Sequence, residues 1–136
     1  MCLSRYAKKC SGYASLPLRL ALGSVFIYHG FGKLFPPGAI EGTGSFFASV
    51  GIPSFLAEPI GVLEFVGGLF LVAGLLTRYV ALLLAADMAV AIALVTLPQG
   101  FAGSEFELTL LLAALSLVLL GSQKFSVDSD VLRKEF

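Results

Sequence analysis

Six ionisable residues lie within stretches of sequence that are otherwise strongly apolar. They are Arg19, His29, Lys33, Glu64, Asp87 and Glu107. A charged side chain at the centre of a lipid bilayer costs about 3 kcal/mol on insertion scales, unless it is paired or faces a polar cavity. Carboxyl groups and bases held in that way can relay protons or hydrogen-bond the polar head of a small molecule. These six residues are therefore the candidate site.

The segment 16–35 has one face that is both small and polar if it is helical. At about 100° per residue, five of its residues fall within an arc of about 80°, and His29 lies about 40° further round. Arg19, near one end, is expected to reach toward Asp87 or to keep its guanidinium among lipid headgroups. The residues of this face are Arg19, Gly23, Phe26, Gly30 and Lys33.

Glu64 is predicted to lie close to the bilayer midplane. It stands about nine residues from the outer end of the segment 55–76, which places it roughly 13 Å deep at about 1.5 Å per residue. Gly61 and Gly68 share its face, and small residues let two membrane helices approach closely. Glu64 is therefore predicted to face protein, with room beside it for a partner side chain, a water or a ligand.

Asp87 lies opposite a stripe of alanines on its predicted helix, about 160° to 200° away. The stripe is typical of a packing seam between membrane helices. Because the two faces cannot meet the same neighbour, one is expected to pack inside the bundle and the other to meet a second chain or a cavity. The stripe consists of Ala81, Ala85, Ala89 and Ala93.

Depth in the bilayer predicts which of these charges pair. Near the outer end, His29 or Lys33 is expected to meet Glu107. Near the middle, Glu64 is expected to meet His29 or Asp87. A lone histidine is most often a hydrogen-bonded structural residue, but the position of His29 on the side of Lys33 also makes it a site candidate.

Composition indicates the solvent in which these elements fold. Of the 136 residues, 57% are apolar and 13% charged, against about 45–50% and about 25% in soluble globular proteins. Such a chain has too little polar surface for water, so lipid is its natural solvent. Nine basic residues balance nine acidic ones, which leaves no basic excess to bind nucleic acid.

Four apolar segments can each cross a bilayer, which takes about 20 residues. We therefore predict an all-α, four-transmembrane-helix bundle, a single integral membrane domain over residues 1–136. A short interfacial helix, capped by Thr43 or Ser45 and ending at Val50, is expected between the first two crossings. A polar cytoplasmic tail follows at 122–136. The crossings are predicted at about 16–35, 55–76, 79–97 and 105–121.

The positive charges predict the orientation in the membrane. Basic residues gather before the first crossing, at the connection that holds Arg78, and after the fourth crossing, while acidic residues occupy the other connections. Cytoplasmic loops carry the excess of Lys and Arg, so both termini are expected in the cytoplasm. The terminal basic residues are Arg5, Lys8, Lys9, Lys124, Arg133 and Lys134.

Other chemistry is sparse in this sequence. One histidine cannot supply a zinc set or both axial ligands of a haem, so no metal site is expected. Cys2 and Cys10 precede the first apolar segment without a CxxC pair. They are expected to be reduced cytosolic thiols, with palmitoylation or redox sensing as the alternative.

At these residues the chain resembles the DoxX family of small four-helix bacterial membrane proteins, over about Leu18 to Asp128. Where the family has Gly-x-Gly after its last helix, this chain has Gly121-Ser122-Gln123. The family pattern points to Arg19, His29, Lys33, Glu64, Arg78 and Glu107, with Arg78 in a structural loop. The matching motifs include Arg19-Leu20-Ala21-Leu22-Gly23, His29-Gly30-Phe31-Gly32-Lys33-Leu34, Gly51-Ile52-Pro53, Gly61-Val62-Leu63-Glu64, Gly67-Gly68, Gly74-Leu75-Leu76-Thr77-Arg78, Phe106-Glu107 and Ser126-Val127-Asp128.

The resemblance implies a bacterial inner-membrane protein that serves a quinone-linked redox complex as a non-catalytic subunit or partner. Quinone is the one cofactor this implies, with other membrane subunits or further copies of the chain as partners. Two alternatives stay open. The chain could be a small proton-coupled transporter or channel that uses Glu64, or an assembly partner whose interior charges only lock the bundle.

Overall fold

The computed structural model describes residues 11–131, and every regular element within them is a helix. The predicted all-α class is confirmed for this part of the chain. Cys2, Cys10 and most of the terminal basic residues lie outside it. The elements are η1 (Ser11–Tyr13), α2 (Ser15–Leu34), α3 (Ala39–Ser49), η2 (Ser54–Leu56), α4 (Ala57–Ala73), α5 (Thr77–Ala91), η3 (Ile92–Thr96), η4 (Leu97–Gln99), α6 (Phe101–Leu120) and α7 (Val127–Asp130).

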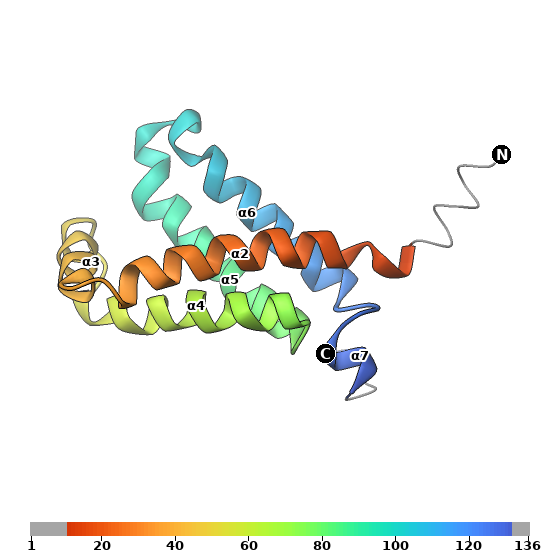
Figure 1. Ribbon diagram of the computed structural model, residues 1–136. Coiled ribbons are helices and arrows are strands. Elements are labelled where there is room, and N and C mark those ends of the chain that lie inside the picture. The colour runs from red at the N-terminus through yellow and green to blue at the C-terminus, as the bar shows by residue number, and fades with distance from the viewer. Residues whose placement is uncertain (1–10, 132–136) are drawn as a thin grey trace.

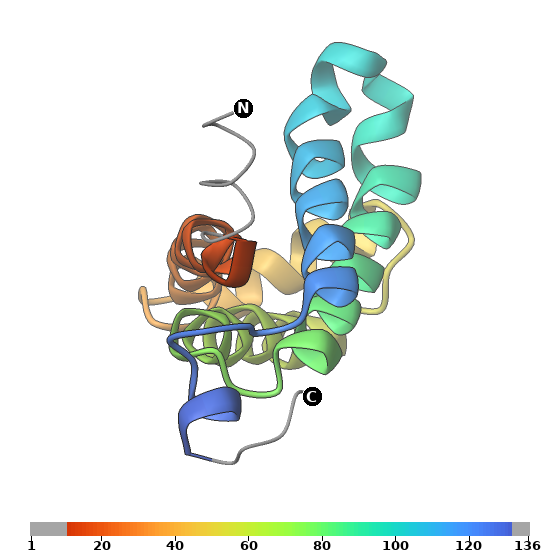
Figure 2. The ribbon, with the colours of Figure 1, turned by 90° about the vertical axis from the view of Figure 1, so that its right-hand side faces the viewer.

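The long helices form two pairs. α2 packs along α4, and α5 packs along α6. The α5–α6 pair rises steeply from the α2–α4 pair, as the two perpendicular views show (Figure 1, Figure 2). α3 lies across one end of α2 and α4, called here the α3 end, and residues 121–131 lie at the opposite end, called the tail end (Figure 1).

Glycine allows α2 and α4 to lie unusually close together. A Cβ built on Gly30 of α2 would stand 2.8 Å from the carbonyl oxygen of Gly61 and 2.7 Å from the Cα of Phe65. No side chain fits in that space, so the backbones themselves are in contact. The small and polar face predicted for this helix is the face that packs: Arg19, Gly23, Phe26 and Gly30 are all buried.

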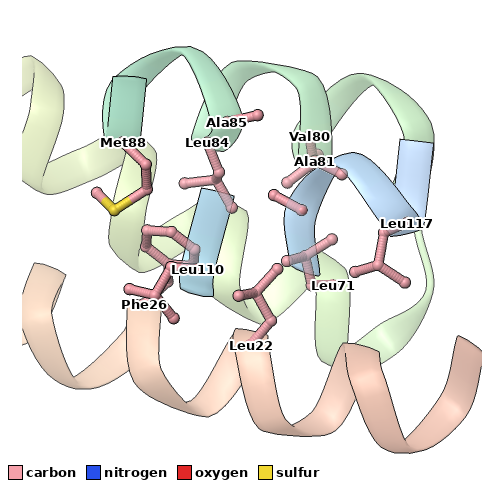
Figure 3. Packing of buried hydrophobic residues seen from close by; sticks show 11 residues of the cluster. Leu22, Phe26, Leu71, Val80, Ala81, Leu84, Ala85, Met88, Leu110 and Leu117 are labelled. Atoms are coloured by element: carbon pink, nitrogen blue, oxygen red, sulfur yellow. The ribbon is translucent and has the colours of Figure 1, made fainter. Parts of the chain in front are cut away.

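The middle of the bundle is a continuous apolar core that all four long helices share. Phe26 and Leu22 of α2 meet Leu71 of α4, Leu84 of α5 and Leu117 of α6 in one cluster (Figure 3). The last three of these side chains are fully buried, at 0% exposure. Ala81 and Ala85 also pack in this cluster, whereas Ala89 and Ala93 are exposed. The alanine stripe is therefore a packing seam along only half its length.

Several element ends differ from their predicted positions. α4 ends at Ala73, because Gly74 takes a left-handed conformation with φ of 69° and terminates the helix. α6 begins at Phe101 rather than at 105. α3 begins at Ala39, so Thr43 and Ser45 lie inside it and neither is its cap; the Ser45 hydroxyl donates to the carbonyl of Glu41 instead.

The segment predicted to cross at 79–97 is one long helix with an irregular last third. α5 continues into the π-helix η3 and then into the 3₁₀-helix η4, which contains Pro98. Proline has no N–H to donate, and its ring clashes with the carbonyl of the residue four positions earlier. The change of helix type just before Pro98 rotates Thr96 into the bundle, where it is buried.

Three helices within the described residues are long and apolar enough to cross a membrane: Ser54–Ala73, Thr77–Gln99 and Phe101–Leu120. They correspond to the second, third and fourth predicted crossings. The helix α2 is also 20 residues long but carries Arg19, His29 and Lys33, and it is not among the three.

Candidate functional site

A cavity of about 290 Å³ lies at the α3 end, between α2, α3, α4 and the diverging α5–α6 pair. Five of the six predicted site residues line it, and the sixth, Arg19, does not. Phenylalanines from α2, α3 and α6, together with Met88, form much of the remaining wall. The polar residues of the cavity are His29, Lys33, Glu64, Asp87, Thr96 and Glu107.

An ion pair joins α2 to α4 in this cavity. The Lys33 ammonium donates to Oε2 of Glu64, and the two side chains are 24% and 4% exposed. Gly61 lies one turn before Glu64, and a Cβ built there would stand 3.3 Å from the Cβ of Lys33. The close glycine contact between the helices is what lets Lys33 reach a buried carboxylate. Glu64 therefore faces protein, and Lys33 meets it rather than Glu107.

Asp87 of α5 is the second carboxyl at the centre of the cavity. It lines the cavity together with Glu64 and Lys33. The structure thus brings Glu64 and Asp87, which were predicted to pair, to one cavity, and the side chain that bonds to Glu64 is Lys33. An ion pair beside a second carboxyl group provides side chains that can exchange a proton with a bound molecule or with water. The face of α5 opposite the buried alanines thus meets a cavity.

Three oxygens that line the cavity have no hydrogen-bond partner among the described residues. They are Oδ2 of Asp87, Oγ1 of Thr96 and Oε2 of Glu107. Buried polar atoms in proteins are almost always hydrogen-bonded. All three can accept a hydrogen bond, but they are buried in the cavity wall, so a donor on a guest or a water reaches them only when these side chains rotate.

His29 stands at the edge of the cavity and not at its centre. It is exposed, and its ring lies 5.9 Å from that of Phe106 on α6 and 5.6 Å from that of Tyr28. The expected contact of His29 with Glu64 is therefore not formed. With Phe106, which is 47% exposed, it flanks the opening between α2 and α6.

Arg19 lies at the tail end and is fully buried there. Its Nη1 donates to the carbonyl of Ser122 at 2.9 Å, and Nη2 donates to the carbonyl of Phe125. The expectation that Arg19 reaches Asp87 or stays among headgroups is wrong, because residues 121–131 fold back and supply carbonyls for it. We call these residues the C-terminal clasp.

The clasp also holds the turn between α4 and α5. Oδ1 of Asp128 accepts from the backbone N–H of Leu76 at 2.9 Å, and Oδ2 accepts from that of Thr77 at 3.3 Å. Arg78 donates from Nη1 to the carbonyl of Val118 at 3.3 Å, so its contact joins α5 to α6. The polar tail predicted at 122–136 is, in its described part, bonded to the bundle through Ser122, Phe125 and Asp128.

Sequence comparison agrees with this architecture. The family model described as DoxX matches residues 14–97. The chain belongs to the DoxX family. A second model, described as TQO small subunit DoxD, matches residues 59–136.

Curated relatives match most of this DoxX chain. "Putative oxidoreductase CatD" of Bacillus subtilis is 39% identical over 120 residues, 88% of this chain and 87% of the relative. "Uncharacterized membrane protein Rv3486" of Mycobacterium tuberculosis is 36% identical over 82% of this chain and 77% of the relative. "Inner membrane protein YqjF" of Escherichia coli is 35% identical over 55% of each chain. No solved structure matches the chain.

The site of this DoxX protein contains one residue that helical phase did not predict. Thr96 enters the cavity because the π-helix changes the register of the last third of its helix. Pro98, two residues later, was the available signal, since it predicts an interruption there. In the described residues no group of three or more His, Cys, Asp or Glu side chains could hold a metal ion.

Proposed function

We propose that this DoxX protein is a non-catalytic membrane subunit or partner of a quinone-linked redox complex, and that its cavity holds the quinone head group. The family supports a redox setting, through the relative named "Putative oxidoreductase CatD" and the match to "TQO small subunit DoxD". The inner membrane of a bacterium is the corresponding place, as the name of the Escherichia coli relative suggests.

The observation that carries the proposal is a buried lysine–carboxylate pair in a cavity lined with phenylalanine. A quinone is a flat apolar ring with two carbonyl oxygens, and its hydroquinone carries two hydroxyls. The Lys33 ammonium and the His29 ring can donate to a carbonyl oxygen. The carboxyl groups of Asp87 and Glu107, which line the cavity, can accept from a hydroxyl. Ligand pockets of this kind start at about 300 Å³, so the volume suits a head group whose tail extends into lipid.

The membrane arrangement is part of the same proposal. We propose that α2, the first predicted crossing, also spans the membrane, which brings the number of crossings to four. Its 20 residues pack along α4, and its charged side chains face protein. The single domain then has four crossings with both termini in the cytoplasm and α3 at the outer face. Partners are lipid, other membrane subunits or further copies of the chain.

Quinone binding is tested on the purified protein in lipid nanodiscs with a short-chain ubiquinone as titrant. Glu64→Gln and Lys33→Met are expected to weaken binding about tenfold or more, the loss of one charged hydrogen bond of about 1.5–3 kcal/mol. Glu58→Gln is the matched control, since Glu58 is exposed on the same helix and does not line the cavity. Equal affinity for all four proteins would refute the site.

Native mass spectrometry from membranes tests the partner role. The proposal expects association with a dehydrogenase or oxidase, and reduced respiratory activity of that complex with Glu64→Gln. Retention of both partner and activity by this variant counts against the proposal. A solute flux in proteoliposomes that depends on a pH gradient and on Glu64 would favour the transporter instead. Neutral variants that lower abundance alone would favour a structural assembly partner.

A further inference from the structure

We infer that the carboxyl groups of the cavity exchange protons with one side of the membrane only, the side on which α3 lies. The cavity is then a proton vestibule with a single entrance, serving whatever molecule binds there. This inference rests on the proposed function for the identity of that molecule, but not for the route of the protons.

The first argument is that the cavity groups collect at one end of the bundle. Lys33 lies in the last turn of α2, and Glu107 lies in the second turn of α6. Thr96, which is 7% exposed, lines the same cavity. These polar residues of the cavity therefore lie on the α3 side of the apolar core.

The second argument is the apolar plug beneath the cavity. Lys33 and Arg19 are separated by 14 residues of α2, about 21 Å along the helix axis. Phe26, Met88 and Leu110 line the cavity, and the other side chains of Figure 3 fill the bundle between them and the level of Arg19, each at most 8% exposed and none of them ionisable. An ion in such a dry medium costs many kcal/mol, so a proton has no carrier through it.

The third argument is that the tail end offers no polar route upward. Arg19 and Asp128 are fully buried there and make their hydrogen bonds to backbone groups of the clasp and the turn. Arg78 donates to the carbonyl of Val118, and Lys124 and Asp130 are exposed at the surface. Arg19 faces the clasp, and Asp128, which is part of the clasp, faces the turn between α4 and α5. None of these hydrogen bonds leads to a residue of the cavity.

The fourth argument is that the opposite side is open. Phe46 of α3, Val90 of α5 and Phe106 of α6 line the cavity and are still 48%, 47% and 47% exposed. The α5–α6 pair diverges from α2 at this end (Figure 1), and Lys33, Asp87 and Glu107 are only partly buried. We therefore place the entrance for water on the α3 side, next to these partly buried groups.

The step that follows is a proton transfer and involves no electron. A bound hydroxyl that ionises gives its proton to the carboxylate of Asp87 or Glu107, which becomes a carboxylic acid. That acid then releases the proton to water on the α3 side, and the carboxylate is regenerated. The other titratable side chains of the cavity are those of His29 and Lys33 on α2 and Glu64 on α4.

Side-specific chemical labelling tests this inference without any quinone or partner. A membrane-impermeant carbodiimide and a charged amine are added to sealed right-side-out or inverted vesicles from expressing cells. The amine forms an amide with an accessible carboxyl group, and peptide mass spectrometry locates it. Glu58, exposed at the start of α4, reports the α3 side, and Asp130, exposed in α7, reports the tail side.

We expect amide at Asp87 or Glu107 in the vesicles that label Glu58, and about tenfold less in those that label Asp130. Labelling of the cavity from the tail side, from both sides equally, or from neither side would overturn the inference. Leu84→Ala opens the plug and is expected to admit label from the tail side. Leu82→Ala, 53% exposed on the same helix, is its control. Failure of quinone binding would leave these results unchanged.

Discussion

Gly23 and Gly68 face each other across α2 and α4, and each takes the space that a side chain on the other would need. A Cβ built on Gly23 would stand 2.7 Å from the carbonyl oxygen of Gly68, and one on Gly68 would stand 2.7 Å from that of Gly23. The obstacle is backbone on both sides, so no side-chain rotation relieves it. This contact fixes the distance between the two helices that carry Lys33 and Glu64.

Gly68→Ala is therefore expected to destabilise the protein by about 1–3 kcal/mol, because the helices must separate to admit a methyl group. The measurement is thermal unfolding of the purified protein in mild detergent. Gly32→Ala is the matched control, because Gly32 lies on α2 and a Cβ built on it has nothing within 4 Å. The seam is not essential if the two variants unfold at the same temperature.

Removing one partner of the ion pair should be worse than removing both. Lys33→Met leaves Glu64, which is 3% exposed, as an unpaired buried carboxylate, and a loss of about 3–5 kcal/mol is expected. Lys33→Met combined with Glu64→Gln should recover most of that loss. Unfolding free energies of the wild type, both single variants and the double variant give the coupling. Additive effects would show that the pair is not coupled in the folded protein.

Asp128 is expected to stabilise the start of α5 from a distance of about 50 residues in sequence. Its carboxylate accepts from the N–H groups of Leu76 and Thr77, as an N-cap residue does. Asp128→Ala should cost about 1–2 kcal/mol, and the turn at residues 74–76 should gain hydrogen–deuterium exchange. Asp130→Ala, an exposed neighbour, serves as the control. Unchanged exchange at the turn would contradict the assignment of the clasp.

Gln123 stands where the DoxX pattern has glycine, and it keeps a φ of 53° that favours glycine. Its side-chain oxygen accepts from the backbone N–H of Ser15 at 3.0 Å, which ties the clasp to the start of α2. Gln123→Ala loses this bond and keeps the strain, so about 1 kcal/mol of destabilisation is expected. Gln123→Gly relieves the strain and should be the more stable of the two variants. The reverse order in thermal unfolding would show that the backbone conformation is not the controlling factor.

The sequence by itself determined that the chain folds in lipid, that its long elements are helices, and that Glu64 points toward protein. A composition with so few charges, apolar segments of membrane length and glycines beside Glu64 are local properties, and the structure keeps Glu64 buried as they require. The motifs that mark the DoxX family are also read from the sequence alone.

Tertiary structure alone decided which charges meet. Lys33 could pair with Glu107 by depth, yet it meets Glu64, because the glycine seam brings α4 closer than α6. Arg19 shares a helix face with Lys33 but bonds to the clasp, since a segment about 100 residues later folds back onto it. Helical phase gives the direction of a side chain, whereas its partner depends on distances between helices that only the packed chain sets.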